Sequence, residues 1–184
     1  MENQGDPWGL GSSKRTEWLA NLDFEVPVVD GKIPEGIEYL YWVGCAGSLD
    51  ERGRKQVEST ARMLHRAGVT FAVLGPRESC TGDPARRMGN EYLFQEMAKA
   101  NIATLNEVGA TKIVASCPHC FNTIKNEYPD LGGSFEVIHH AELLSHLIEA
   151  AELHQMKVQG KLKAQGRGDE VSVVDISQVV ERSL

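Results

Sequence analysis

The chain has few cysteines, no long apolar run and no surplus of positive charge. Its formal net charge is −7 over 184 residues, which argues against nucleic acid or an anionic membrane surface as the main partner. No apolar stretch approaches the roughly 18 residues that a membrane-spanning helix needs. We therefore expect no nucleic-acid partner and no direct membrane span.

A secretory signal is not expected either, because residues 1–11 lack a basic stretch followed by an apolar one. The resulting expectation is a cytoplasmic protein, with any association with a membrane made through a partner. Under reducing conditions cysteines act more often as metal ligands or catalytic thiols than as structural disulfides. The four cysteines are therefore the most informative residues of the chain.

The cysteines are Cys45, Cys80, Cys117 and Cys120, and their spacing matches a repeating structural unit. The first two are separated by 35 positions, and Cys80 and Cys117 by 37. A strand, a crossover helix and the return to a parallel strand take about 30 or more residues. Successive units of this kind return the chain to the same edge of the sheet, so three loops are expected to bring the cysteines together.

The apolar pattern supports this topology. Short apolar segments that favour strands alternate with longer segments of helical periodicity. The predicted strands cover residues 39–43, 70–74, 112–115 and 135–138, and the predicted helices cover 50–67, 90–108, 118–128 and 141–151. This order predicts an α/β fold with a parallel sheet, helices on both faces and the cysteine loops at the carboxyl edge of the strands. The cysteines are expected outside the interiors of strands and helices.

Three regions are expected along the chain. Residues 1–36, rich in proline and glycine, form an extended amino-terminal arm. Residues 37–151 form the cysteine-rich domain, and residues 152–184 form a polar tail with one further strand and a short helix. Within the arm, Trp8 and Trp18 either pack on the domain's own surface or offer a docking site to a neighbouring domain or subunit.

The cysteines allow four interpretations. Ordinary buried thiols would not all gather at strand ends. Structural zinc sites usually combine two close ligand pairs, and only one close pair is present. A thiol–disulfide oxidoreductase would use Cys117 and Cys120 at the opening of a helix, which lowers a thiol pKa, but it leaves Cys45 and Cys80 without a role. An iron–sulfur cluster, most simply a 4Fe–4S cubane, uses all four thiolates.

Several motifs also occur in the order of a known family. Gly44-Cys45-Ala46-Gly47, Cys80 to Arg87, Cys117 to Thr123 and His139-His140 resemble the cysteine-rich "CCG" domain family. That family includes a component of heterodisulfide reductase and related iron–sulfur oxidoreductases. The resemblance implies an electron-transfer domain or subunit that corresponds to one cysteine-rich repeat and is not active alone. It also implies a ferredoxin-like or membrane redox subunit as partner. A non-catalytic fragment that binds a partner chain remains an alternative.

One departure from the family pattern bears on the cluster. The family often has two adjacent cysteines where this chain has Cys80 and Thr81, so a plain four-thiolate cluster is expected. Thr81 is expected to make a hydrogen bond to the backbone of the Cys80 loop or to a cluster sulfur. Arg86 is either a solvated side chain or a residue that fixes the charge of the cluster. His139 and His140 are either capping or core histidines, or donors to the cluster or a proton relay.

Overall fold

The computed structural model describes residues 5–151. The chain divides into two units, Met1–His140 and Ala141–Leu184, and the sheet and all four cysteines belong to the first. In the second unit residues 141–151 are helical, as their periodicity predicts. The polar tail predicted for residues 152–184, with its strand and short helix, lies outside the described residues.

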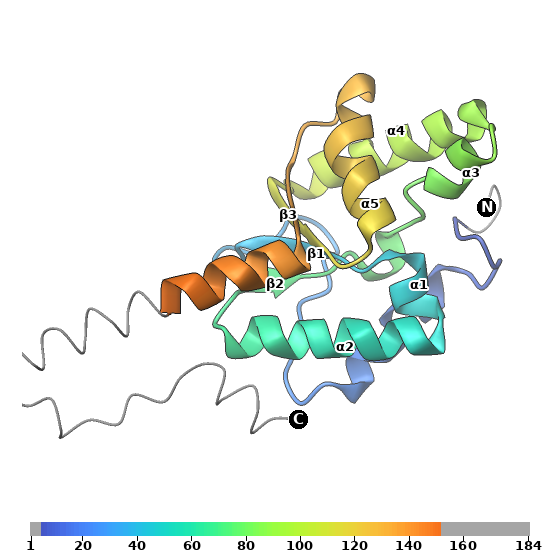
Figure 1. Cartoon of the computed structure of the whole chain (residues 1–184). Helices are drawn as coiled ribbons and strands as arrows, with labels where there is room; N and C mark the ends of the chain where they lie inside the picture. Colours follow the sequence, from blue (N-terminus) through green and yellow to red (C-terminus); the bar gives the residue numbers. More distant parts are fainter. Residues whose placement is uncertain (1–4, 152–184) are drawn as a thin grey trace, which may run out of the picture. The chain divides into compact units, whose positions relative to one another are not determined.

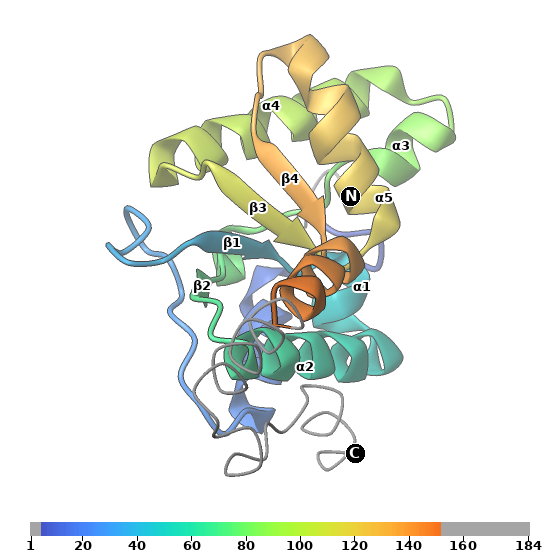
Figure 2. The same cartoon turned by 60° about the vertical axis from the view of Figure 1, so that its left-hand side comes forward.

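The first unit is built on one parallel sheet of four strands, ordered β2-β1-β3-β4 (Figures 1 and 2). The predicted α/β fold is therefore confirmed. The strands are β1 (Tyr39–Trp42), β2 (Phe71–Ala72), β3 (Lys112–Ala115) and β4 (Glu136–His139). The shortest, β2, is extended by an isolated parallel bridge between Val28 and Val73.

The helices begin where the sequence offers caps. The Asp50 side chain accepts a hydrogen bond from Gly53 N at the start of α2, and the Asn90 side chain accepts one from Leu93 N at the start of α4. The α-helices are α1 (Gly44–Leu49), α2 (Glu51–Arg66), α3 (Asp83–Arg87), α4 (Glu91–Val108) and α5 (Pro118–Asn122). The other helical segments are the 3₁₀-helical η1 (Ser12–Asn21), η2 (Gly75–Arg77) and η4 (Tyr128–Leu131) and the π-helical η3 (Thr123–Glu127).

Residues 118–128 depart from the single helix that the sequence predicts. The α-helical turn of α5 gives way to the π-helical η3 and then to the 3₁₀ turn η4. Pro129 near the start of η4 has no backbone N–H and so cannot continue the α-helical ladder. The predicted helix is therefore three short pieces in succession.

Helices cover both faces of the sheet, with α4 and α5 on one side and α2 on the other (Figure 1). Leu40 and Trp42 of β1 join the apolar cluster that includes Phe94 of α4. Tyr41, which alternates with them, makes edge-to-face contacts with Phe71 and with Trp18 of η1. Burial on both faces explains why the strands are almost wholly apolar.

The strand order creates a place for a ligand. Strands β1 and β3 are neighbours in the sheet although β2 lies between them in the chain. Their carboxyl ends are level, because Trp42 pairs with Ala115. In open parallel sheets ligands bind at such a point, where neighbouring connections leave in opposite directions. The loops that carry Cys45 and Cys117 start there.

The amino-terminal segment is packed on this unit along much of its length. Trp18 is only 1% exposed, so it lies in the domain's own interior, whereas Trp8 is 53% exposed. Val29 is buried, and its amide donates to Val73 O at 2.8 Å. The segment thus contributes core residues as well as surface.

Candidate metal centre

The first cysteine follows β1 where the chain turns sharply. Gly44 has a φ of +78°, in the left-handed region that favours glycine, and opens α1 just before Cys45. A Cβ added at Gly44 would lie 3.3 Å from Cys120 Sγ and 3.7 Å from Cys117 Cβ. Glycine therefore lets this loop approach the cysteine pair that follows β3. Cys45 and Cys120 lie in the first turns of the short helices α1 and α5.

The pair Cys117 and Cys120 lies at the amino end of a helix. Cys117 is the N-cap of α5, and Pro118 occupies its first turn, where a backbone N–H has no helical partner. A hydrogen bond from the Cys120 thiol, together with the amides of Cys120 and His119, outweighs burial and lowers the pKa of Cys117 to about 6. The same hydrogen bond and full burial raise the pKa of Cys120. The pKa values of the two thiols are thus shifted in opposite directions.

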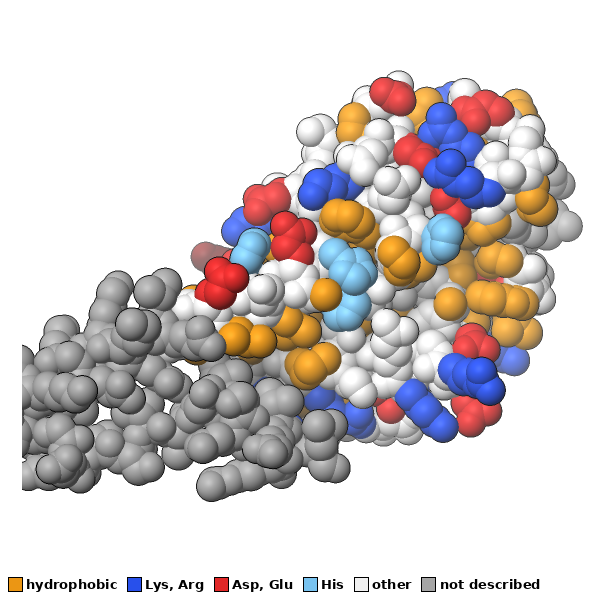
Figure 3. All heavy atoms as spheres, viewed as in Figure 1, with side chains coloured by type: hydrophobic (Ala, Val, Ile, Leu, Met, Phe, Trp, Pro, Cys, Tyr) orange, Lys and Arg blue, Asp and Glu red, His pale blue; other side chains and the backbone are white. Residues whose placement is uncertain are grey.

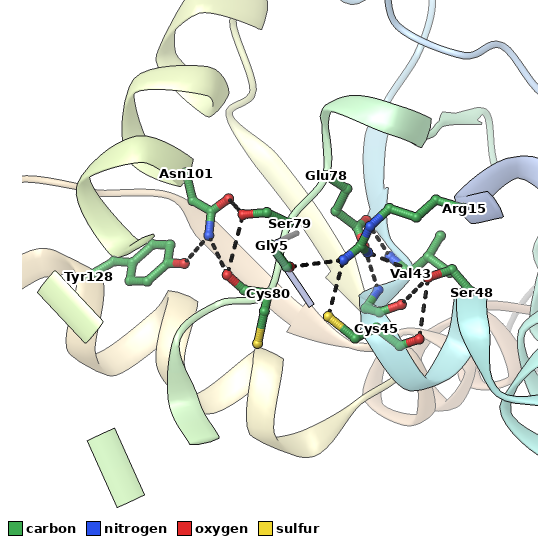
Figure 4. A network of polar contacts seen from close by, with 11 residues as sticks. Gly5, Arg15, Val43, Cys45, Ser48, Glu78, Ser79, Cys80, Asn101 and Tyr128 are labelled. Carbon is green, nitrogen blue, oxygen red and sulfur yellow. Dashed lines mark hydrogen bonds and ion pairs between the residues drawn. The ribbon is translucent and has the colours of Figure 1, made fainter. Parts of the chain in front are cut away.

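Cys80 lies in the connection between β2 and α4, where groups from distant elements hold its backbone (Figure 4). Its amide donates to Gly5 O at 2.7 Å. Asn101 of α4 donates to Cys80 O at 2.8 Å and to the Tyr128 hydroxyl at 3.0 Å, and accepts from Ser79 Oγ at 2.8 Å. Asn101 and Tyr128 are both buried. A buried amide with all these partners fixes the loop in one conformation.

The four predicted ligands come together from three loops. A hydrogen bond between Cys45 and Cys80, together with burial, raises the pKa of Cys45, and the same hydrogen bond lowers that of Cys80. Beyond the Cys117 hydrogen bond and burial, the charge of Cys45 also raises the pKa of Cys120. The thiols are therefore arranged as two pairs that lie close enough to influence each other. Within residues 5–151, no three His, Cys, Asp or Glu side chains form a group that fits a single metal ion.

A buried arginine that the sequence analysis did not foresee lies against this group. The Arg15 guanidinium donates to Cys45 Sγ at 3.2 Å, to Glu78 Oε1 at 3.0 Å and to Gly5 O at 3.3 Å (Figure 4). Arg15 is only 3% exposed. Burial alone would lower its pKa, but the negative charges of Glu78 and Cys45 raise it above its usual value. A buried cation is thus held beside a sulfur.

Glu78 completes this arrangement from the loop before Cys80. Its carboxylate accepts from Gly44 N at 2.8 Å and from Val43 N at 2.9 Å, besides Arg15. Burial raises the pKa of Glu78, and Arg15 and the two amides offset this rise only in part. Three donors on two oxygens at these distances are the arrangement of an ionised carboxylate. Glu78 therefore ties the end of β1 to the connection after β2.

A second carboxylate links the Cys80 loop to the Cys117–Cys120 pair. Asp83 follows Gly82, which has a φ of +89° and starts α3. Asp83 is 5% exposed, and its oxygens lie 3.2 Å from His119 Nδ1 and 3.5 Å from Thr123 Oγ1. Arg87 pairs with the same carboxylate at 3.0 Å. The turn after Cys80 and the helix after Cys117 are thus joined through side chains.

The residues expected around the cluster lie in different settings. Thr81 is buried, and its carbonyl accepts from the Tyr128 hydroxyl at 3.1 Å. His139 ends β4 and His140 follows it, with ring centroids 4.4 Å apart, and His139 packs edge-on against Phe121. Burial and the neighbouring histidine lower the pKa of His140. Among the described residues, His139 Nε2 and His140 Nδ1 are buried without a hydrogen-bond partner.

Arg86 faces acidic and aromatic side chains. It pairs with Glu127 at 3.0 Å and Glu91 at 3.4 Å, and its guanidinium lies 4.5 Å from the centre of the Phe94 ring. Basic and acidic side chains also lie next to one another on the face in Figure 3. Arg86 is therefore ion-paired in the structure, and the guanidinium that lies against a cysteine is that of Arg15.

Comparison with known proteins finds a matching family and several relatives. Residues 39–125 match the family described as "Cysteine-rich domain" (CCG). The chain is 46% identical over 156 residues to the "Probable iron-sulfur-binding oxidoreductase FadF" of Bacillus subtilis, and the match covers 83% of this chain and 22% of that protein. No solved structure matches the chain.

Two further relatives are named as redox proteins. The "EtfAB:quinone oxidoreductase" of Syntrophomonas wolfei is 41% identical, over 87% of this chain and 22% of that protein. One component of the "Dihydromethanophenazine:CoB--CoM heterodisulfide reductase" of Methanosarcina barkeri is 32% identical, over 67% of this chain and 31% of that protein. The chain thus spans less than a third of the length of these relatives.

Proposed function

Because residues 39–125 place this chain in the cysteine-rich domain family, we propose that it is an electron-transfer domain or subunit of an iron–sulfur oxidoreductase. Cys45, Cys80, Cys117 and Cys120 would bind one 4Fe–4S cluster. The observation that carries the proposal is the meeting of four thiols from three loops at the carboxyl edge of a parallel sheet. When bound, such a cluster supplies one-electron transfer.

The donor set fits such a cluster. Four soft thiolates are the ligands that iron–sulfur clusters take. Cys45, Cys80 and Cys120 are buried, and Cys117 is partly exposed. Met97 and Leu93 of α4 pack against Cys45 and Cys80 and keep water from them. The amides at the start of α5 stabilise negative charge on Cys117. The chain's own residues would therefore hold the thiolates in a largely dry site.

The identity of residue 81 favours a cubane with no fifth protein thiolate. A threonine hydroxyl is a hard oxygen with a high pKa, and it matches iron in a sulfide cluster poorly. Thr81 stands where the family often has a second cysteine. Around the cluster, Thr81, His139, His140 and Arg86 would act through hydrogen bonds and charge and would not ligate iron.

We propose that this chain needs a redox partner and is not active alone. The relatives FadF and the quinone oxidoreductase are each matched over only 22% of their length, and the remainder offers room for further redox modules. A ferredoxin-like or membrane redox subunit is the partner that this arrangement implies. None of the described helices is long and apolar enough to cross a bilayer. We propose a cytoplasmic location, with any association with a membrane made through the partner.

The competing function is thiol–disulfide exchange at Cys117 and Cys120. The pKa of about 6 for Cys117, at the amino end of a helix, is the observation that favours it. An anaerobic absorption spectrum of the purified full chain separates the two functions. We expect a broad band near about 400 nm with bound iron and sulfide. A colourless chain with two rapidly alkylated thiols would support the thiol enzyme instead.

A further inference from the structure

We propose that Arg15 is a positioning residue of the metal centre, which holds Cys45 and raises the reduction potential of the cluster through its buried charge. The proposal rests on the proposed function, since it requires a cluster bound to Cys45. Arg15 lies outside residues 39–125, which match the family. The amino-terminal segment would thus be part of the centre.

Two buried hydrogen bonds hold the Arg15 guanidinium between a cysteine and a carboxylate. Arg15 Nη2 lies 3.2 Å from Cys45 Sγ, and Nη1 lies 3.0 Å from Glu78 Oε1. Both charged side chains are about 2% exposed. Leaving one of two buried charges without its partner is strongly unfavourable. The buried pair with Glu78 therefore keeps the Arg15 guanidinium in place beside Cys45.

The segment that carries Arg15 is itself tied to the cysteine loops. Gly5 O accepts from both Arg15 and the Cys80 amide. The buried Asp6 carboxylate accepts from the amides of Trp8, Leu10 and Gly11, which fixes the turn between Gly5 and η1. The guanidinium is thus held from a rigid turn on one side and from Glu78 on the other.

The direction of the effect follows from charge. A cluster gains one negative charge on reduction, so a nearby fixed cation favours the reduced form and raises the potential. The site is buried, so solvent and salt screen the interaction weakly. Glu78 acts in the opposite sense, and its negative charge raises the pKa of Cys120. Loss of Arg15 and loss of Glu78 should therefore shift the potential in opposite directions.

The test is a redox titration of the full chain, reconstituted anaerobically with iron and sulfide and followed by its visible absorption. It compares Arg15→Gln, Arg15→Lys and Glu78→Gln with the unmodified chain at pH 9, which favours the carboxylate form of an unpaired Glu78. Arg62→Gln is the control, because Arg62 is also ion-paired, with Glu58 at 3.8 Å, and donates a hydrogen bond to Asn21 O, and among the described residues it makes no hydrogen bond to a cysteine. Iron per chain is measured for each variant.

We expect a lower midpoint potential for Arg15→Gln, a smaller fall for Arg15→Lys, a rise for Glu78→Gln and no shift for Arg62→Gln. An unshifted Arg15→Gln variant with full iron would overturn the proposal. If that variant loses its iron, the sign of the Glu78→Gln shift decides, and a fall or no shift there contradicts the proposal. Loss of iron in all three variants, with full iron in Arg62→Gln, would assign Arg15 to cluster retention and refute the tuning role. An unmodified chain without iron would refute the proposed function itself.

Discussion

The two cysteine pairs are supported in different ways. Cys117 and Cys120 are near neighbours in the chain and rely on nearby backbone, namely the amides that open α5. Cys45 and Cys80 come from separate loops and rely on distant side chains, a guanidinium from before the first strand and an amide from α4. Cys117 is partly exposed, whereas Cys120 and both members of the Cys45–Cys80 pair are buried.

This difference separates two tasks within one site. A helix amino end stabilises a thiolate through local geometry and leaves it accessible. A buried ion pair and a buried amide hold together segments that are far apart in the chain. We therefore expect reactivity to reside in the Cys117–Cys120 pair, and stability and tuning of the site to reside around Cys45 and Cys80.

The largest expected effect comes from removing any single thiolate. Each of the four Cys→Ser variants should lose most of the bound iron, because serine oxygen is a poor ligand for a sulfide cluster. Iron per chain after anaerobic reconstitution measures this. If Cys45→Ser and Cys80→Ser keep full iron while Cys117→Ser abolishes thiol reactivity, the two pairs are not one site.

In the metal-free chain Cys117 should be alkylated roughly tenfold or more faster than Cys45 or Cys80 at pH 7. The thiolate is the reactive form, and a pKa of about 6 leaves the partly exposed Cys117 mostly ionised at that pH. The pKa of Cys45 is raised, and both Cys45 and Cys80 are buried away from the reagent. The rate at Cys117 should rise through pH about 6 and then level off. Peptide mass spectrometry after iodoacetamide treatment measures it, and faster reaction at Cys45 or Cys80 would reverse the comparison.

Asn101→Ala tests the support of the Cys80 loop. It removes the partner of Ser79 and of the Cys80 carbonyl, so we expect a loss of about 1–3 kcal/mol in the free energy of unfolding. The control is Thr104→Ala, whose exposed hydroxyl bonds within α4, with an effect within about 0.5 kcal/mol. Equal effects of the two changes in denaturant titrations would contradict the role of Asn101.

Alanine substitutions at two glycines distinguish the cost of backbone strain from the cost of contact with the cysteines. Gly44 and Gly68 both have positive φ, +78° and +75°, so alanine at either position costs about 1–2 kcal/mol. Only the Cβ at Gly44 meets other atoms, the nearest being Cys120 Sγ. Gly44→Ala should therefore destabilise the chain more than Gly68→Ala and also lower its iron content. Equal losses of stability with full iron in both would argue against close approach of the two loops.

The smallest effect is expected at Thr81. Thr81→Ala should keep the full iron content and shift the potential only modestly, because the hydrogen bond that the structure gives Thr81 is made by its carbonyl. Thr81→Cys restores adjacent cysteines and tests whether a fifth thiolate changes the cluster type. Loss of iron in Thr81→Ala would show that the hydroxyl itself is needed.

Sequence reasoning predicts those parts of the site that depend on residues close together in the chain. The apolar pattern and the caps predict β3 and α4 within one residue at each end, and Pro118 marks the start of α5 beside Cys117. Arg15, Glu78 and Asn101 escape prediction, because each acts through contacts with residues far away in the chain. The weak signals for them are the bulky Trp18 in a segment that looks like a free arm, and an acidic residue two positions before Cys80.

The central claim is that the two pairs bind one cluster, and the most direct measurement is the iron and sulfide content of the unmodified chain with paramagnetic resonance of its reduced form. We predict about four iron atoms and four sulfide ions per chain and the signal of a single cubane. A colourless chain with two fast thiols, or a larger centre that uses a further protein ligand, would contradict the account.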